Sequence, residues 1–264
     1  MSPLIKGIRR GTMKNENIIE VRGIHKTYKS GMFGRRKTHA LRGIDLDIKK
    51  GEIFGVLGPN GAGKTTFLNI LIGQLETDEG SVMVMGHDVT KNFSNNIKSR
   101  MNMCSGNPNF PWSLNVEEAL KFYGMLYGFS GKDLKHRVEH NIEIFGLEEN
   151  RRVLYDELST GNKQKLAMAK AMLNDPEILL LDEPTTGLDP DIAQKTRKLI
   201  KKIHKERDIT TILTTHYMPE AEELCGRIAF IRNGKIIALG TKSELKKSTK
   251  TKDLEGMFIA LANK

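Results

Sequence analysis

Residues 53–66 read IFGVLGPNGAGKTT, an apolar run that leads into a glycine-rich turn, a lysine and two threonines. The turn matches the pattern G-x-x-x-x-G-K-[ST], in which backbone N–H groups wrap phosphates, the lysine reaches the β and γ oxygens, and a hydroxyl ligates Mg²⁺. A strand before this turn and a helix after it would set the positive end of the helix against the phosphates. The stretch therefore predicts a nucleotide site, with Lys64 on the phosphates and Thr65 on the metal.

The same stretch indicates the kind of fold that surrounds it. An apolar strand at 53–57 is typical of a parallel sheet that is buried on both faces, and the helix after the turn carries an apolar face as far as Gly73, which is expected to end it. From about residue 92 to 174 the strand signals vanish and helical ones take over. We therefore predict an α/β core with a mostly parallel sheet and an inserted helical subdomain. Local patterns predict strands at 18–21, 40–48, 178–182, 209–214, 228–231 and 235–239, a turn at Asn233-Gly234, and helices that begin after Asn115, near Asn162 and at Asp189-Pro190.

Composition and charge bound the class of protein. The chain has 264 residues, a net charge of +10 and two cysteines, Cys104 and Cys225, which are expected to be reduced thiols. No run of about eighteen apolar residues and no leader pattern occurs, so we expect a cytosolic protein. The basic residues gather in clusters, which we interpret first as solvated faces and second as a surface near an anionic membrane leaflet. No aromatic residues interleave with them, which argues against a nucleic-acid partner.

Three further blocks follow in order along the chain: LSTGNKQ at residues 158–164, ILLLDEP at 178–184 and TTH at 214–216. Together with the glycine-rich turn they resemble the nucleotide-binding domain of ATP-binding cassette (ABC) proteins, over about residues 18–239. The resemblance implies a P-loop ATPase core with a mostly parallel sheet, an antiparallel β subdomain and the inserted helical subdomain. We expect a polar basic tail at 1–17, an ATP-binding domain at 18–240 and a short helical extension at 241–264.

The resemblance also implies roles for polar residues of these blocks. Asp182 ends an apolar strand beside the phosphate loop, where its carboxylate would hold Mg²⁺ directly or through water. Glu183 would polarise the attacking water, and His216 would contact the γ-phosphate. Tyr28 would stack on adenine, with a plain surface tyrosine as the alternative. The expected contacts of ATP in the phosphate loop are Gly58, Asn60, Gly61, Gly63, Lys64, Thr65 and Thr66.

The LSTGNKQ block opens a helix, whose positive end would bind an anion. In ABC proteins that anion is the γ-phosphate held by the other subunit. Ser159 and Gly161 therefore imply a homo- or heterodimer that closes over two ATP molecules, with Asp189 at the same interface.

Two features depart from the commonest family pattern. The glutamine that usually precedes the helical subdomain is missing, since Gly106 or Asn107 stands at its position. In the family this glutamine contacts Mg²⁺ and couples the domain to its membrane partner, so its absence implies a change in one of these two roles. Thr160 and Asn162 replace a glycine and a glutamine of the commonest signature. The form LSTG followed by x-K-Q, like the ending at residues 254–258, resembles the ATPases of ABC-2-type exporters.

Our first hypothesis is the ATPase subunit of an ABC-2-type exporter, which binds ATP and Mg²⁺ and lies peripherally at the cytoplasmic face of the cell membrane. It would dock on separate transmembrane permease subunits through its helical subdomain.

An importer ATPase is an alternative, although only about twenty-five residues follow Leu239, where sugar-type importers usually add a regulatory domain. A further alternative is a soluble ABC protein that acts as a switch on the ribosome or DNA. Such proteins carry two cassettes in one chain or long coiled coils, and this sequence shows neither. Glu183 and His216 argue against a subunit that no longer hydrolyses ATP, and the LSTGNKQ block argues against an ordinary phosphate-loop kinase.

Overall fold

Two β-sheets form the centre of the computed structural model, which describes residues 17–30, 36–105, 109–249, 251 and 253–262. The strands are β1 (Asn17–Ser30), β2 (Arg36–Lys49), β3 (Ile53–Leu57), β4 (Glu79–Val84), β5 (His87–Asp88), β6 (Met101–Ser105), β7 (Ile178–Asp182), β8 (Thr210–Thr215), β9 (Arg227–Arg232) and β10 (Lys235–Thr241). A six-stranded sheet has the order β10-β9-β3-β8-β7-β6, in which all neighbours are parallel except β10 and β9. A four-stranded antiparallel sheet has the order β2-β1-β4-β5.

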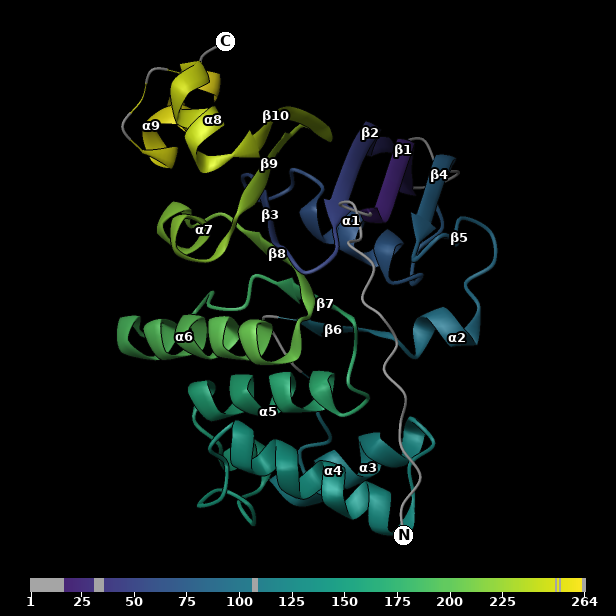
Figure 1. Ribbon diagram of the computed structural model, residues 1–264, viewed down its shortest axis with the longest axis vertical. Coiled ribbons are helices and arrows are strands. Elements are labelled where there is room, and N and C mark those ends of the chain that lie inside the picture. The colour runs from purple at the N-terminus through teal and green to yellow at the C-terminus, as the bar shows by residue number, and fades with distance from the viewer. Residues whose placement is uncertain (1–16, 31–35, 106–108, 250, 252, 263–264) are drawn as a thin grey trace, which may run out of the picture.

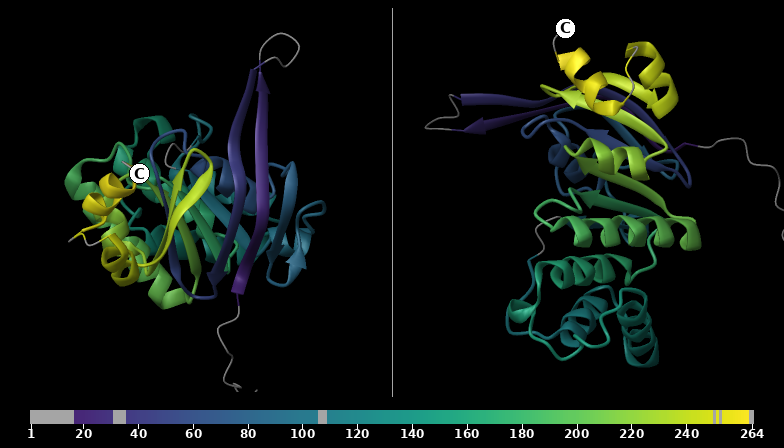
Figure 2. Two further views of the ribbon diagram at one scale, coloured as in Figure 1. Left: turned by 90° about the horizontal axis from the view of Figure 1, so that it is seen from above. Right: turned by 90° about the vertical axis from the view of Figure 1, so that its left-hand side faces the viewer.

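Helices surround the two sheets (Figure 1). They are α1 (Lys64–Leu71), α2 (Asn95–Lys98), α3 (Val116–Leu126), α4 (Gly131–Ile144), η2 (Tyr155–Glu157), α5 (Thr160–Met172), α6 (Pro190–Arg207), α7 (Met218–Leu224), α8 (Lys242–Thr249) and α9 (Leu254–Ala262). α3 and α4 lie at one end of the molecule, beyond α5, and the hairpin of β1 and β2 projects from the body (Figure 2). Within the described ranges, no helix combines the length and the apolar character needed to cross a bilayer.

The six-stranded sheet is buried on both faces. Along β3, Ile53 and Leu57 pack into a core shared with α3 to α7, whereas Phe54 and Val56 pack into a second core with α1 and the four-stranded sheet. This two-sided burial explains why β3 is apolar throughout rather than alternating. It also leaves the strand ends as the places where polar side chains can reach solvent.

The predicted sheets are present, but two strands extend further than the sequence pattern suggests. β1 continues past the strand expected at 18–21 through a shift in its pairing register near Gly23, and β2, which has a shift near Gly43, extends beyond both ends of the strand expected at 40–48. Both glycines have positive φ, 57° and 79°. The bulge in β1 interrupts the apolar alternation while the pairing goes on, so the local pattern ends before this strand does.

The expectation that residues 92–174 hold no strand is wrong at β6, and β4 and β5 lie where no strand was predicted. β6 is an edge strand of the six-stranded sheet and pairs with β7. Asn102 interrupts its apolar residues and donates hydrogen bonds to the Tyr127 hydroxyl and to Asn174 Oδ1. Because an edge strand needs less apolar surface than a central one, its sequence carried no clear strand signal. The domain boundaries stay a prediction.

Helix α3 begins with the predicted capping arrangement. Asn115 Oδ1 accepts a hydrogen bond from the Glu118 N–H at 3.0 Å, and the Glu118 carboxylate accepts one from the Asn115 N–H at 3.0 Å. The turn between β9 and β10 also forms as predicted, with φ 49° at Asn233 and 74° at Gly234. These local signals required only nearby residues, and they are confirmed.

Replacing Asn115 with alanine is expected to lower the free energy of unfolding by about 1 kcal/mol, because the Glu118 N–H loses its acceptor. Urea unfolding followed by circular dichroism measures the change. Ser130→Ala is the matched control, since Ser130 caps α4 without a side-chain hydrogen bond. Equal losses in the two variants would contradict the capping argument.

The two cysteines are free and buried. Burial raises the pKa of the Cys104 thiol to about 12 and also raises the pKa of Cys225. Buried neutral thiols are unreactive, so neither cysteine points to thiol chemistry.

Candidate functional site

The glycine-rich loop joins β3 to α1 and passes close to the backbone of two other strands. Gly63 has φ 107°, and a Cβ there would lie 2.4 Å from the carbonyl oxygen of Ala40 in β2. At Gly58 a Cβ would lie 2.2 Å from the carbonyl oxygen of Ile231 in β9. Only glycine fits such approaches. They place the loop between β2 of the four-stranded sheet and the edge of the six-stranded sheet at which β3 and β9 end.

Lys64 begins α1, and its side chain is only 5% exposed. The ammonium group donates to the carbonyl oxygens of Gly58 at 2.9 Å and Pro59 at 3.2 Å, and it pairs with Glu183 Oε1 at 3.1 Å. These contacts fix a buried positive charge over the loop, which suits an anionic ligand.

Thr65 and Asp182 meet at this edge although 117 residues separate them in the chain. The Thr65 hydroxyl donates to Asp182 Oδ2 at 2.9 Å, and the Thr214 hydroxyl donates to Asp182 Oδ1 at 2.5 Å. A hydroxyl and a carboxylate are hard oxygen donors of the kind that Mg²⁺ prefers. The two residues predicted to ligate the metal therefore lie together and have the chemistry it requires.

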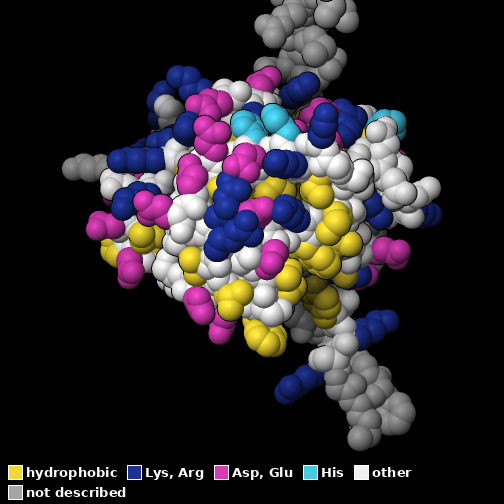
Figure 3. Space-filling view, turned by 90° about the horizontal axis from the view of Figure 1, so that it is seen from below, with side chains coloured by type: hydrophobic (Ala, Val, Ile, Leu, Met, Phe, Trp, Pro, Cys, Tyr) yellow, Lys and Arg dark blue, Asp and Glu magenta, His cyan; other side chains and the backbone are white. Residues whose placement is uncertain are grey.

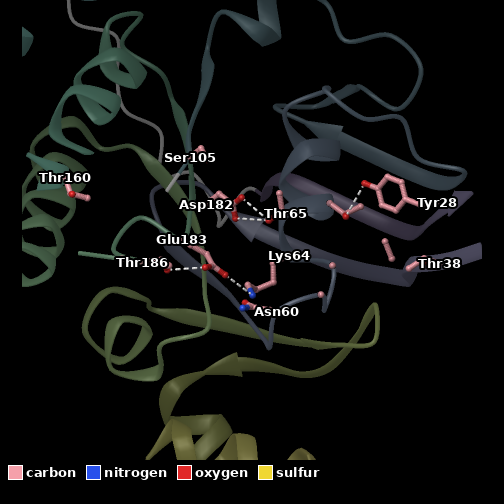
Figure 4. Close-up of a pocket in the computed structure, with 15 residues that line it drawn as sticks. Tyr28, Thr38, Asn60, Lys64, Thr65, Ser105, Thr160, Asp182, Glu183 and Thr186 are labelled. Carbon is pink, nitrogen blue, oxygen red and sulfur yellow. Dashed lines mark hydrogen bonds and ion pairs between the residues drawn. The ribbon is translucent and has the colours of Figure 1, made fainter. Parts of the chain in front are cut away.

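Glu183 lies at the centre of a polar cluster (Figure 4). Its backbone is left-handed, with φ 50°, and its N–H donates to the carbonyl oxygen of Thr214 at 3.1 Å. One carboxylate oxygen pairs with Lys64, and the other accepts a hydrogen bond from the Thr186 hydroxyl at 3.1 Å and lies 3.2 Å from Nδ1 of His216. Partial burial opposes ionisation, but Lys64 and His216 outweigh it, so the pKa of Glu183 lies below its ordinary value. Glu183 is therefore a carboxylate at neutral pH.

A cavity of about 780 Å³ lies over the loop and takes in the hairpin of β1 and β2. Its volume is in the range of ligand sites for molecules of nucleotide size. Tyr28 lines it from the hairpin, is 42% exposed, and has its hydroxyl 3.3 Å from Thr66 Oγ1. The other predicted residues that line it are Asn60, Gly61, Gly63, Lys64, Thr65, Thr66, Asp182 and Glu183.

Sequence reasoning missed the other lining residues, which are Thr38, Ala40, Ser105, Thr160, Thr186 and Gly187. Thr186 and Gly187 follow Glu183 closely, so their position in the chain was a usable signal. No sequence signal marked Thr38 and Ala40, because their position in the cavity depends on how β2 lies against the phosphate loop.

The structure does not bring Ser159 and Gly161 to this cavity. Ser159 caps α5 by accepting a hydrogen bond from the Asn162 N–H at 3.3 Å, and a Cβ on Gly161 would lie 2.8 Å from Ile192. Thr160, between them, lines the cavity at a distance from Lys64 and Thr65 (Figure 4). The departure predicted at residues 106–107 lies outside the described residues.

Comparison with known proteins points to one family. The family model described as "ABC transporter" matches residues 41–186. The daunorubicin/doxorubicin resistance ATP-binding protein DrrA of Streptomyces peucetius is 36% identical over 230 residues, which cover 87% of this chain and 67% of that protein. The cholesterol transporter ABCA5 of Homo sapiens is 37% identical over 233 residues, which cover 86% of this chain but only 14% of that protein. A dimeric post-hydrolysis state of the ATP-binding cassette MJ0796 bound to ADP and Pi matches with a TM-score of 0.74 at 27% identity, over 84% of this chain and 98% of that one.

Proposed function

The chain belongs to the ABC transporter family, and we propose that it is the ATP-binding and ATP-hydrolysing subunit of an ABC-2-type exporter. It would pair with a second nucleotide-binding subunit around two Mg-ATP molecules, lie peripherally at the cytoplasmic face of the cell membrane, and drive export through separate permease subunits. The observation that carries the proposal is the placement of Glu183 between Lys64 and His216 at the edge of the cavity.

This placement supports hydrolysis of the terminal phosphate of ATP. The loop N–H groups and the positive end of α1 would bind the phosphates, with Lys64 on the β and γ oxygens. The Glu183 carboxylate would accept a hydrogen bond from the attacking water, and His216, which contacts the same carboxylate, would lie beside the γ-phosphate. Thr65 and Asp182 would hold Mg²⁺, which when bound neutralises charge on the phosphate oxygens.

The position of the signature residues supports a dimer. Ser159 and Gly161 do not line the cavity that contains Lys64, and Thr160, which does, lies at a distance from Lys64 (Figure 4). A second subunit would therefore have to bring its own α5 N terminus to the γ-phosphate. The positive end of a helix suits that anion. The MJ0796 cassette, which shares this fold, is described as dimeric.

The surface around α3 supports a membrane partner. Trp112 is 74% exposed, Leu126 67% and Met125 55%. Figure 3 views the end of the molecule that α3 and α4 occupy and shows hydrophobic side chains gathered on one side of it. Exposed apolar groups of this size mark interaction sites, so we propose that this surface docks on the permease.

Export, rather than import, is supported by the LSTG-x-K-Q form of the signature and by the resemblance to DrrA, a resistance protein. The presence of both Glu183 and His216, in contact at 3.2 Å, supports an active ATPase rather than a subunit that only binds nucleotide.

The test is co-purification of tagged Glu183→Gln protein from native membranes in detergent with Mg-ATP, followed by identification of its partners. A stoichiometric polytopic membrane protein is expected. Ribosomal or DNA-bound partners, or none beyond a second copy of the chain, would contradict the transporter assignment.

Replacing Tyr28 with alanine is expected to raise the KM for ATP about tenfold, because stacking of a base on an aromatic ring contributes roughly 1–3 kcal/mol. Tyr28→Phe is the matched control, since it keeps the ring and removes only the hydroxyl near Thr66. Steady-state ATPase kinetics measure both variants. A wild-type KM for the alanine variant would show that Tyr28 is a plain surface residue.

A further inference from the structure

Glu220 is a buried carboxyl group to which the proposed mechanism gives no role. The residue lies on α7 and is 1% exposed. Its Oε1 accepts a hydrogen bond from the Thr185 hydroxyl at 2.7 Å, and the Thr215 side chain interacts with the same carboxyl group. Both threonines are themselves buried. A buried carboxyl with two such partners fixes the segments that carry them, because losing it leaves polar groups unpaired.

The first partner belongs to the segment that follows Glu183. Thr185 lies two residues after Glu183, and its neighbour Thr186 donates a hydrogen bond to the Glu183 carboxylate. The Thr186 N–H also donates to the carbonyl oxygen of Glu183 at 3.2 Å. The bond from Thr185 to Glu220 therefore ties down the tight turn that orients Glu183.

The second partner belongs to the end of β8. Thr215 directly precedes His216, whose Nδ1 lies 3.2 Å from the Glu183 carboxylate. Thr215 Oγ1 also accepts a hydrogen bond from the Tyr217 N–H at 2.9 Å, which fixes the backbone on both sides of His216. Glu220, which does not line the cavity, thus contacts the segments of Thr186 and His216, two of the three whose side chains touch Glu183, the third being that of Lys64.

We propose that Glu220 is a positioning residue for ATP hydrolysis, which keeps the segments of Thr185 and Thr215 in register so that Glu183 stays aligned with the attacking water. The inference rests on the proposed function and assigns a further residue to the same site. A displacement of about 1 Å at a reacting group can cost roughly 100-fold in rate. Nucleotide binding is expected to be spared, because the phosphate loop and Tyr28 lie on other elements.

The experiment compares Glu220→Met, whose unbranched side chain has no oxygen to accept the hydrogen bond from Thr185, with Thr185→Val and the double variant. All are measured in steady-state ATPase assays, with thermal unfolding as the measure of fold. Each single variant is expected to lower kcat about tenfold, while the KM for ATP stays within about twofold. The losses in the double variant are expected not to add, because both substitutions break the same hydrogen bond. Glu223→Met is the matched control on the same helix, since Glu223 pairs with Arg197 and Lys201 instead. Its kcat should equal that of the wild type.

The wild type and Glu183→Gln are measured in the same series. If the wild type shows no turnover, both the proposed function and the role of Glu220 are wrong. If the wild type hydrolyses ATP and the folded Glu220 and Thr185 variants match its kcat, only the role of Glu220 is wrong. Additive losses, or losses that follow the thermal midpoint and KM, would show a merely structural role. Should Glu220→Met not fold, Thr185→Val decides alone, because it removes the same hydrogen bond with little change of shape.

Discussion

Replacing Glu183 with glutamine is expected to lower ATP turnover at least about 100-fold while ATP binding is retained, because general-base assistance contributes roughly 10²–10⁴-fold. Glutamine has the same shape and can still accept the hydrogen bond from Thr186. Its neutral amide, however, cannot polarise water as the carboxylate does. The change also releases the Lys64 ammonium from its ion pair, which leaves that charge available to the phosphates. Release of phosphate measures turnover, and titration with a fluorescent ATP analogue measures binding.

Glu177→Gln serves as the control for this prediction. Glu177 is a carboxylate that pairs with Arg100 at 2.6 Å and does not line the cavity. Its removal should leave turnover unchanged. Hydrolysis by Glu183→Gln at the wild-type rate would show that the assigned base is wrong.

Replacing Lys64 with alanine is expected to weaken ATP binding by about 10- to 100-fold and to abolish turnover. A hydrogen bond to a charged group contributes about 1.5–3 kcal/mol, and the substitution removes the ammonium that would bind the phosphate oxygens. It also leaves the Glu183 carboxylate facing those phosphates without its cation. Because Lys64 helps to hold the pKa of Glu183 below its ordinary value, that pKa should rise in the variant.

Calorimetric titration with ATP measures the affinity of this variant. Lys198→Ala, which removes an exposed lysine of α6, is the control and should bind ATP as the wild type does. An unchanged affinity in Lys64→Ala would contradict the assignment of the phosphate loop.

The parts of the fold that could be predicted from sequence depend on short-range chemistry. The glycine-rich turn, the apolar strand β3 and the cap at Asn115 each follow from a few adjacent residues. β6 was missed because an edge strand can carry Asn102, whose side chain is paired with residues distant in the chain. Its strand character is visible only once its neighbour β7 is in place.

The same distinction holds for the site. Lys64, Asp182 and Glu183 could be named because each stands in a recognisable block. Thr38 and Ala40 line the cavity only because β2 lies beside the phosphate loop, and a pattern within β2 cannot indicate that neighbour. Glu220 could not be named for the same reason, since its partners are buried threonines from two other segments.

The order of strands in the six-stranded sheet also bears on how the chain folds during synthesis. β3 emerges early, yet both of its neighbours, β8 and β9, lie in the last quarter of the chain. The Gly51 N–H, just before β3, donates to the Thr210 hydroxyl across 159 residues. Because β8 and β9 are synthesised late, the apolar strand β3 stays unpaired in the nascent chain until both have been made. Contacts between residues this far apart in sequence also form slowly. During that interval the strand is a site at which a holding chaperone would prevent aggregation.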